Sequence, residues 1–369
     1  MTRAARDRRV FVFEEPLGGV DRPSLDVTKP ARNITVATPR IPDDYSSVDR
    51  VLMQRDLLDA WLARENVRRF TAWYYTPMAL PFAGHLDADC VVYDCMDELS
   101  GFAGAPAELR SLERQLFMRC DIVFTGGHSL HEAKRRYHSQ VHAVPSSVDF
   151  DHFVRARTCR EAKDQAHLPR PRLGYCGVID ERLDLGLIGE IARARPEWQL
   201  VLVGPVTKID PASLPQAPNI HYLGGRAYQE LPRYLAGWDA ALLPFAHNES
   251  TRFISPTKTP EYLAAGRPVV STGVRDVVRT FGDNGLVEIA DGTAPFIAAI
   301  ERVLTHDNAE RQQRVDRYLA SQSWDRTWSR MQALIARVIS AGAAVGPLRP
   351  QYRDNVNSAP SVSAPQPAT

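Results

Sequence analysis

Short apolar runs that alternate with helical segments constrain the fold of this chain more than any other feature of its sequence. In the first half, the predicted strands are residues 10–13, 34–38, 70–75, 91–93, 122–124 and 141–144, and the predicted helices are residues 47–66, 106–119 and 129–137. In the second half, the predicted strands are residues 173–177, 199–203, 220–223, 240–243, 269–270 and 286–289, and the predicted helices are residues 185–194, 228–236, 260–265, 294–304 and 309–340. Strands that alternate with helices predict an α/β protein with parallel sheets and helices on both sheet faces.

The alternation occurs twice, which indicates two Rossmann-like, doubly wound domains. We expect residues 1–155 to form the first domain and residues 171–340 to form the second, with the last helices attached to it. Residues 156–170 are poor in apolar side chains and rich in charge, so they are expected to link the two. Residues 346–369 are rich in Pro, Ser, Ala and Gln and have almost nothing to bury, which predicts a disordered tail.

The chain starts with a polar, arginine-rich stretch ahead of the first apolar run. Residues 1–9 look like the end of a surface helix, although an α/β domain usually begins with a strand. We therefore expect either an unusual start or a first domain that lacks its first strand and loop. A solvated face is the favoured explanation of the arginines, and a membrane or nucleic-acid patch is the alternative. These arginines are Arg3, Arg6, Arg8 and Arg9.

Composition argues against several classes of partner. The 369 residues include 45 Lys and Arg against 44 Asp and Glu, and the net charge of +1 does not indicate nucleic-acid binding. The five cysteines have no zinc-ligand spacing and lie mostly in apolar runs, so we expect reduced thiols, a cytoplasmic location and no metal site. No signal peptide and no membrane-spanning apolar run is recognised in the sequence.

Residues 255–272 combine a helix start, a short helix, a stop and a strand. Thr259 is suited to cap the helix and Pro260 to its first position, while Gly266 is suited to the left-handed position after its end. A lysine and hydroxyl groups at the start of a helix favour phosphate binding, and a neighbouring carboxylate can accept hydrogen bonds from two sugar hydroxyls. These polar residues are Ser255, Thr257, Lys258 and Glu261. They suit a nucleotide diphosphate with its ribose.

Four further clusters follow predicted strands, where ligands bind in open α/β sheets. Gly177 and Arg182 follow the first strand of the second half, and a glycine with an arginine can hold phosphate as readily as it can form an ordinary turn. Gly204 ends the next strand, where a structural turn is the favoured explanation. Asp94, Asp97 and Glu98 follow residues 91–93 and can bind hydroxyls, take a proton or cap a helix. In the fourth cluster, residues 126–129, Ser129 is expected to cap a helix and His128 to be exposed.

With these motifs in place, the chain resembles the GT-B-fold group 1 (family 4-like) glycosyltransferases, and more narrowly their teichuronic-acid and exopolysaccharide branch. The most specific block is residues 256–270, from Pro256 through Lys258, Glu261 and Gly266 to Val270. Further matches are residues 92–99, 145–153 and 223–232, and the resemblance runs from about residue 8 to about residue 334.

The resemblance implies a transferase that moves a sugar from a nucleotide-diphosphate sugar to a hydroxyl of a saccharide or lipid-linked acceptor. It implies two domains facing a cleft, with the acceptor on the side of the first domain. It also implies retention of anomeric configuration, no metal or other cofactor, and a role in bacterial cell-surface polysaccharide biosynthesis at or near the inner membrane face. Asp97 becomes an acceptor-side residue. The implied donor-binding residues are Gly177, Arg182, Gly204, Tyr228, Arg252, Ser255, Thr257, Lys258 and Glu261, and cations such as Lys258 and Arg182 would stabilise the leaving diphosphate.

The chain departs from the family in two ways. The wider family has a second glutamate eight residues before Glu261, where this chain has Phe253, so Ser255, Asn248 or backbone would have to take over its task. Relatives also have a strand and loop ahead of the arginine-rich start. Two alternatives therefore stay open: a nucleotide-sugar-binding protein without activity, and a nucleotide-sugar epimerase on the same architecture, with Asp97 and His128 as its acid and base.

Overall fold

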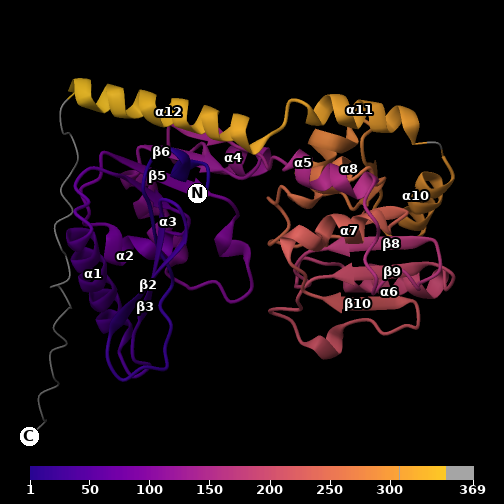
Figure 1. Ribbon diagram of the computed structural model, residues 1–369, viewed down its shortest axis with the longest axis horizontal. Coiled ribbons are helices and arrows are strands. Elements are labelled where there is room, and N and C mark those ends of the chain that lie inside the picture. Colours follow the sequence, from indigo (N-terminus) through magenta and orange to yellow (C-terminus); the bar gives the residue numbers. More distant parts are fainter. Residues whose placement is uncertain (307, 346–369) are drawn as a thin grey trace, which may run out of the picture. The chain divides into compact units, whose positions relative to one another are not determined.

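The computed structural model describes residues 1–306 and 308–345, which fall into two compact units. The first unit comprises residues 1–70, 79–89 and the end of the described chain from residue 336. The second comprises residues 71–78 and 90–335. The three sheets and the helices that cover them can be followed in Figure 1.

The sheet of the first unit is a mixed one. Its strands are β1 (Val10–Phe13), β2 (Ser24–Ala31) and β3 (Ile34–Arg40), in the order β1-β3-β2. β1 is parallel to β3, whereas β2 is antiparallel to it. β2 was missed from the sequence because its side chains are mostly exposed, so its apolar alternation is weak. Asn33, at φ 62°, makes the tight turn between β2 and β3, since asparagine tolerates the left-handed conformation.

Helix α1 (Ser47–Arg64) contributes the buried side chains of Leu58 and Trp61 to the core of this unit. Ser46 caps it by accepting a hydrogen bond from the N–H of Asp49 at 3.1 Å. Its buried Trp61 packs edge-on against Phe11 of β1, with ring centroids 5.3 Å apart. α2 (Leu80–Ala83) completes the unit, together with the end of α12 (Trp324–Val345). The predicted helix over residues 47–66 is thus confirmed, apart from its last two residues.

The first sheet of the second unit is fully parallel. Its order is β4-β5-β6-β7, with β4 at Thr71–Tyr74, β5 at Cys90–Cys95, β6 at Ile122–Thr125 and β7 at Val141–Ala143. Every residue of β5 and β6 is buried, as expected of strands covered on both faces. The helices that follow these strands are α3 (Leu109–Arg119), α4 (His128–Lys134) and α5 (Phe150–Phe153).

The second sheet of this unit has the strand order β10-β9-β8-β11-β12-β13, and all of its pairings are parallel. Its strands are β8 (Arg172–Cys176), β9 (Gln199–Val203), β10 (Ile220–Gly224), β11 (Ala240–Leu243), β12 (Val269–Ser271) and β13 (Glu288–Ile289). The order runs outward in both directions from β8 and β11, so the topological switch point lies between these two strands. In doubly wound sheets this is where ligands bind.

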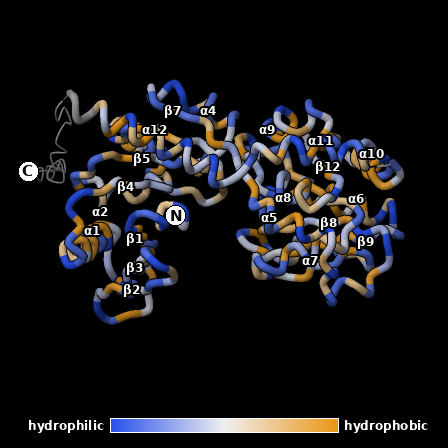
Figure 2. The backbone as a smooth tube through the Cα atoms, turned by 45° about the horizontal axis from the view of Figure 1, so that its top comes forward, coloured by the Kyte–Doolittle hydropathy of each residue, from blue (hydrophilic) through white to orange (hydrophobic). Residues whose placement is uncertain are grey.

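Six helices are described with the second sheet: α6 (Leu185–Ala194), α7 (Leu231–Ala236), α8 (Lys258–Ala264), α9 (Arg275–Val277), α10 (Thr293–Thr305) and α11 (Ala309–Leu319). The start of α12 contacts the first sheet of this unit, where the ring of Trp328 lies 6.0 Å from that of Trp73 on β4. Hydrophobic stretches recur along α10, as they do along α1, between hydrophilic ones (Figure 2). Trp238 lies fully buried against β8, and a side chain at Gly174 would meet its ring at 1.9 Å. Glycine is therefore required there for packing.

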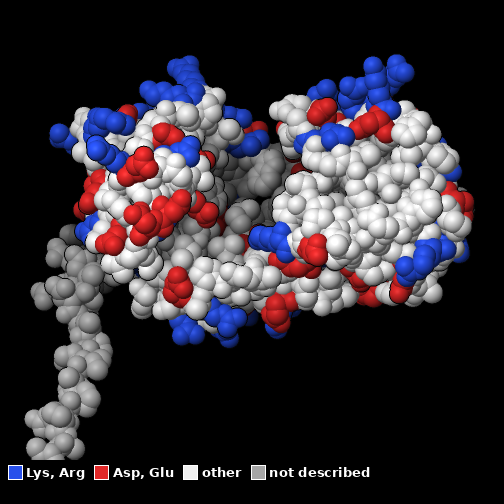
Figure 3. All heavy atoms as spheres, turned by 90° about the horizontal axis from the view of Figure 1, so that it is seen from below, with Lys and Arg blue, Asp and Glu red and all other residues white. Residues whose placement is uncertain are grey.

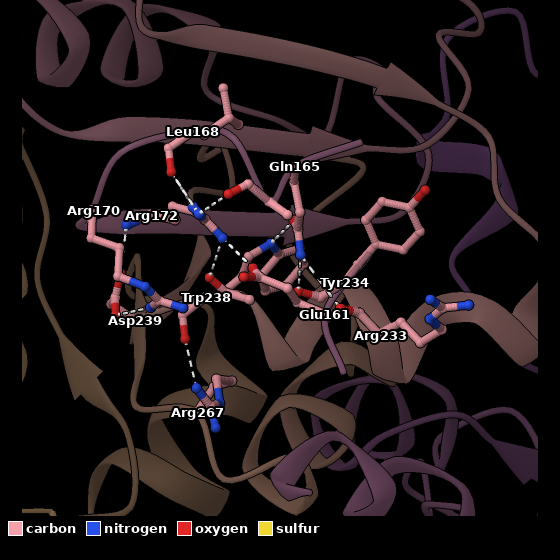
Figure 4. Close-up of polar contacts among 12 residues, drawn as sticks. Glu161, Gln165, Leu168, Arg170, Arg172, Arg233, Tyr234, Trp238, Asp239 and Arg267 are labelled. Atoms are coloured by element: carbon pink, nitrogen blue, oxygen red, sulfur yellow. Dashed lines mark hydrogen bonds and ion pairs between the residues drawn. The ribbon is translucent and has the colours of Figure 1, made fainter. Parts of the chain in front are cut away.

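A buried polar network joins residues 161–170 to the second sheet (Figure 4). Arg172 is buried and pairs with Glu161, and it donates to the carbonyl oxygen of Leu168 at 2.9 Å. Gln165, fully buried, donates to Tyr234 O at 2.8 Å and accepts from the indole N–H of Trp238 at 3.1 Å. These hydrogen bonds satisfy the buried polar groups, so residues 161–170, which were predicted to belong to a linker, pack on the second sheet.

Three local predictions were wrong. Ser129 is not the cap of α4, because its hydroxyl donates to the Asp276 carboxylate at 2.5 Å and Gly127 precedes the helix. Thr259 is fully buried inside α8, whose cap position is Thr257. The helix expected over 309–340 is two helices, since Ser323 begins α12 by accepting from the N–H of Arg326 at 3.2 Å. The predicted tail over 346–369 lies outside the described residues.

Candidate functional site

The candidate site lies at the carboxyl end of β8, the strand that borders the switch point of the second sheet. A glycine follows β8, and another follows its neighbour β9. Gly177 follows β8 with φ 149° and Gly204 follows β9 with φ 155°, backbone conformations that other residues rarely adopt. A side chain on Gly204 would lie 1.9 Å from the carbonyl oxygen of Gly177, so these two strand ends touch. Both residues were predicted at a ligand-binding edge, and the structure brings them together.

Lys258, the first residue of α8, reaches over Gly177. Its Cε would lie 2.0 Å from a Cβ on Gly177, and its Nζ lies 5.6 Å from the centre of the Tyr175 ring. Tyr262, one turn further along α8, fixes the helix to β8, because its hydroxyl accepts from Cys176 N at 2.7 Å and donates to Cys176 O at 3.1 Å. The start of α8 is thereby attached to the end of β8.

The charges at this helix start are perturbed by burial. Burial, with the nearby Arg182 guanidinium, lowers the pKa of the Lys258 ammonium. Burial raises the pKa of the Glu261 carboxyl to about 7, and the charge of Lys258 opposes that rise only in part. Among the described residues, neither side chain has a hydrogen-bond or ion-pair partner from the protein. Strongly perturbed groups that lack internal partners are candidates for ligand contact.

Arg182 is held in place by Asp180. The buried Asp180 carboxylate accepts from Arg182 Nη2 at 2.6 Å and from Nε at 2.9 Å, and also from the Arg182 backbone N–H at 3.0 Å. On its open side the guanidinium stacks over the ring of Phe102, 5.7 Å from its centre. The arginine is therefore pre-organised, which lowers the entropic cost of holding an anion.

Asp97 faces these two cations from the other sheet of the same unit. Burial raises the pKa of its carboxyl, while the charges of Arg182 and Lys258 oppose that rise. Asp97 thus lies within electrostatic range of the cationic pair. The two other acids predicted beside it do not join it: Asp94 is buried and accepts from Trp73 Nε1 at 3.1 Å, and Glu98 pairs with Lys134 at 2.8 Å.

The remaining predicted residues lie around this centre in different settings. The Ser255 carbonyl accepts from the Ser146 hydroxyl at 3.0 Å, and Thr257 is exposed at the start of α8. Tyr228 stacks on His152 with ring centroids 4.3 Å apart, so it presents an aromatic face near the end of β10. Arg252 is exposed, lies 3.6 Å from Glu249, and lines a separate cavity.

Asn248 and His128 have less direct contact with the centre. Asn248 organises its own loop, since its side-chain oxygen accepts from Ser250 at 2.7 Å and from the N–H of Thr251 at 3.1 Å. Its amide donates to the Glu181 carbonyl at 2.8 Å. His128 is the first residue of α4 and half-buried. Nothing in their contacts assigns either residue a ligand.

Sequence reasoning missed the residues that position the predicted ones. Asp180 and Phe102 both contact Arg182, and Tyr262 is hydrogen-bonded to the backbone of Cys176. None of the three belongs to a recognisable sequence motif. Asp180 offered the only usable signal: an acid two residues before a phosphate-binding arginine can hold that arginine in place.

Neither sign of charge predominates on the face of the molecule drawn in Figure 3, where basic and acidic side chains are interspersed. Within residues 1–306 and 308–345, no helix is both long enough and apolar enough to cross a bilayer, and no three His, Cys, Asp or Glu side chains gather as metal ligands.

Comparison with known proteins links this architecture to sugar transfer. Residues 170–306, which contain β8 to α10, match the family model described as glycosyl transferases group 1. Over 286 residues the chain is 29% identical to TuaH of Bacillus subtilis (strain 168), which bears the name of a teichuronic acid biosynthesis glycosyltransferase, and the match covers 71% of each chain.

Solved structures share the fold at low sequence identity. A sucrose-phosphate synthase from Thermosynechococcus elongatus aligns with a TM-score of 0.66 and 16% identity, over 92% of this chain and 91% of its own. An α,α-trehalose-phosphate synthase from Burkholderia vietnamiensis aligns with a TM-score of 0.65 and 17% identity, over 92% and 100%. The Escherichia coli trehalose-6-phosphate structure bound with UDP-2-fluoro glucose aligns with a TM-score of 0.60 and 14% identity, over 90% and 91%. These likenesses show that the chain shares the α/β fold of these proteins.

Proposed function

Because the chain is a group 1 glycosyltransferase with the GT-B fold, we propose that it moves a sugar from a nucleotide-diphosphate sugar to a hydroxyl of a saccharide or lipid-linked acceptor. The name of TuaH favours a product that belongs to a cell-surface polysaccharide. The proposed place of action is the cytoplasm, at the inner face of the membrane where such acceptors are held.

The observation that supports this proposal best is the grouping of Lys258, Arg182 and Glu261 beside the end of β8, where Lys258 reaches over Gly177. Lys258, which has no ion-pair partner in the described part of the chain, and Arg182, which Asp180 orients, can hold the diphosphate. The absence of a side chain at Gly177 lets its backbone approach the phosphates. The Glu261 carboxylate can accept from both hydroxyls of the ribose. Gly204 and the exposed ring of Tyr228 would border the base.

The chemistry follows from where charge develops. The bond from the sugar carbon C1 to the diphosphate breaks, the diphosphate leaves with the electron pair, C1 bonds to the acceptor oxygen, and the proton of the acceptor hydroxyl passes to the leaving diphosphate. Lys258 and Arg182 stabilise the negative charge that grows on the leaving diphosphate, so a metal-independent reaction is proposed. Asp97 would hold the acceptor hydroxyl on the opposite side. We further propose retention of configuration, in which no dedicated general base is needed.

Ser255 and Thr257 complete the proposed donor site. The Ser255 hydroxyl and the exposed Thr257 hydroxyl flank the start of α8, where they would reach phosphate oxygens. Arg252 is less suited to the diphosphate than these residues, since it lines the neighbouring cavity.

The test is release of nucleoside diphosphate from a panel of nucleotide sugars, with and without an added chelator. The wild-type protein should release the diphosphate in the presence of acceptor, and Lys258→Ala should release it at least 100-fold more slowly. Nuclear magnetic resonance of the product should show the anomeric configuration of the donor. Binding without turnover would support the inactive alternative, and an epimeric nucleotide sugar without transfer would support the epimerase.

A further inference from the structure

A second cavity lies beside the candidate site, between α3, α4 and residues 249–253. Its volume is about 580 Å³, large enough for one or two sugar rings. Glu98 and Gly101, which directly follow Asp97 along the chain, belong to its wall. The cavity therefore adjoins the carboxylate that we assign to the acceptor side.

Positive charge exceeds negative charge in this cavity. Six Lys and Arg and four Glu side chains line it, which gives a net charge of +2. All four carboxylates are engaged by cations: Glu98 and Glu113 by Lys134 at 2.8 and 2.7 Å, Glu132 by Arg275 at 2.7 Å, and Glu249 by Arg252 at 3.6 Å. Each carboxylate of the wall thus has a cationic partner in the protein, and Glu98 and Glu113 share a single lysine.

The cations that remain over are Arg110, Arg114 and Arg136. Arg110 and Arg114 are one turn apart on α3, both exposed, and neither has a hydrogen-bond or ion-pair partner in the part of the chain that the structure describes. Among the described residues, Arg136 interacts with the neighbouring Tyr137: it donates to the Tyr137 hydroxyl at 2.7 Å and lies over its ring, 4.7 Å from the centre. Guanidinium groups arranged in this way suit a planar carboxylate or a phosphate.

The floor beneath these arginines is rigid. Lys134 is buried and bridges Glu98 of the loop after β5 to Glu113 of α3, and Glu113 also accepts from the Tyr93 hydroxyl at 2.9 Å. This network attaches α3 and α4 to the strand that carries the acceptor-side loop. An anion bound at the rim would therefore be held at a fixed distance from Asp97.

The wall includes aromatic side chains, and one of them is Phe253. This residue stands where the wider family has a glutamate, eight positions before Glu261. Its ring lies 5.2 Å from the guanidinium of Arg252, and across the cavity Phe117 stacks with Tyr137 at 5.4 Å. With Phe253 in place of a carboxylate, the cavity has one negative charge fewer and one apolar surface more.

From these observations we propose that the cavity is an acceptor subsite for a negatively charged saccharide, with Arg110, Arg114 and Arg136 holding its carboxylate or phosphate. Aromatic walls suit the apolar face of a sugar ring, and the arginines select for charge. The proposal rests on the proposed transferase function, whose acceptor class it specifies.

The test is binding of three probe sugars to the full chain by ligand-observed nuclear magnetic resonance at low ionic strength: glucuronate, glucose 6-phosphate and glucose. At least one charged sugar should bind at least tenfold more tightly than glucose, and its affinity should fall with added salt. Preference for glucuronate would indicate a uronic acid acceptor, and preference for the phosphate a phosphorylated one. Equal affinity for all three, or no binding by any, would overturn the proposal.

Substitutions locate the binding. The double variant R110Q/R114Q should bind the preferred charged sugar at least tenfold more weakly, while R193Q/R317Q, which removes the same charge from exposed arginines outside the cavity, should bind it as the wild type does. Phe253→Glu should weaken binding about tenfold, and Phe253→Gln should leave it within about twofold. Wild-type affinity in R110Q/R114Q or in Phe253→Glu would place the anion elsewhere and refute the subsite.

A parallel titration with uridine and guanosine diphosphate separates this proposal from the proposed function. R110Q/R114Q should bind the nucleotide as the wild type does. If no nucleoside diphosphate binds the wild-type protein while charged sugars still bind, the donor assignment fails and the subsite stands. If a nucleoside diphosphate binds and charged sugars do not, the donor assignment stands and the subsite is refuted.

Discussion

The two ends of β8 show how the same kinds of residue serve different purposes. At the amino end, Arg172, Glu161 and Gln165 form a network in which the charged and amide groups have partners inside the protein. At the carboxyl end, Lys258 and Glu261 have no such partners among the described residues, and burial perturbs the pKa of both. Charge that is paired internally stabilises the fold, whereas charge that is kept unpaired at an open edge is available to a ligand.

The largest expected effect in this comparison is on stability at the amino end. Arg172→Ala should lower the free energy of unfolding by about 3–5 kcal/mol, because it leaves several buried carbonyl oxygens and the half-buried Glu161 carboxylate without their partner. Urea unfolding measures this. Nucleotide affinity of the folded fraction should stay the same. A variant with wild-type stability would show that the network contributes nothing.

At the carboxyl end, substitution should affect activity rather than stability. Lys258→Ala should lower kcat/KM by about 10²–10³-fold, since it removes a cation from the leaving diphosphate. Its free energy of unfolding should be unchanged or higher, because the lowered pKa of Lys258 shows that burying this charge is unfavourable. Steady-state kinetics and urea unfolding on the same sample measure both. A loss of more than about 1 kcal/mol in stability would assign Lys258 to the fold instead.

Glu261 should make the stability of the protein depend on pH. Its folded-state pKa of about 7 exceeds the usual value of 4.5, so between these values the folded protein holds a proton that the unfolded chain has lost. Stability therefore falls as the pH rises from about 4.5 to 7, by roughly 1–3 kcal/mol from this group. Glu261→Gln should remove that part of the slope in urea unfolding, and should weaken nucleotide binding about tenfold. An unchanged slope would contradict the burial of this carboxyl.

The smallest of these effects concerns backbone access. Gly177→Ala should weaken nucleotide binding about three- to fivefold, because the new methyl group would meet the flexible end of Lys258 and the φ of 149° is unfavourable for alanine. Gly186→Ala is the matched control, since Gly186 has ordinary φ and its nearest neighbour, an Asp184 carboxylate oxygen, lies 3.3 Å away. Isothermal titration calorimetry should show weaker nucleotide binding by Gly177→Ala and wild-type binding by Gly186→Ala. Equal nucleotide affinities of the two variants would show that binding does not require a residue without a side chain at position 177.

Much of the second unit could be predicted from the sequence, because its signals are local. Helix α6 was predicted over its observed residues, and Gly266 has the left-handed φ of 77° expected after α8. Periodicity, helix stops and glycine at strand ends act over a few residues, so a single sequence reveals them. The clustering of Gly177, Lys258 and Glu261 followed from the rule that ligands bind where parallel strands end.

What the sequence did not reveal depends on contacts between distant residues. Ser129 has the pattern of a helix cap, yet its partner is Asp276, 147 residues away. Thr259 resembles a cap as well, but packing places it inside the core. Asp180 and Lys134 act by holding another charged group, and such pairing has no sequence motif. Strand β2 was missed for a different reason, since an exposed edge strand needs little apolar patterning.

The central claim, that the carboxyl end of β8 binds the donor nucleotide, is tested most directly by isothermal titration calorimetry of nucleoside diphosphates. The account predicts that at least one binds the wild-type chain, that Lys258→Ala and Glu261→Ala each bind it at least tenfold more weakly, and that Arg193→Gln binds it as the wild type does. Wild-type affinity in both Lys258→Ala and Glu261→Ala would contradict the account.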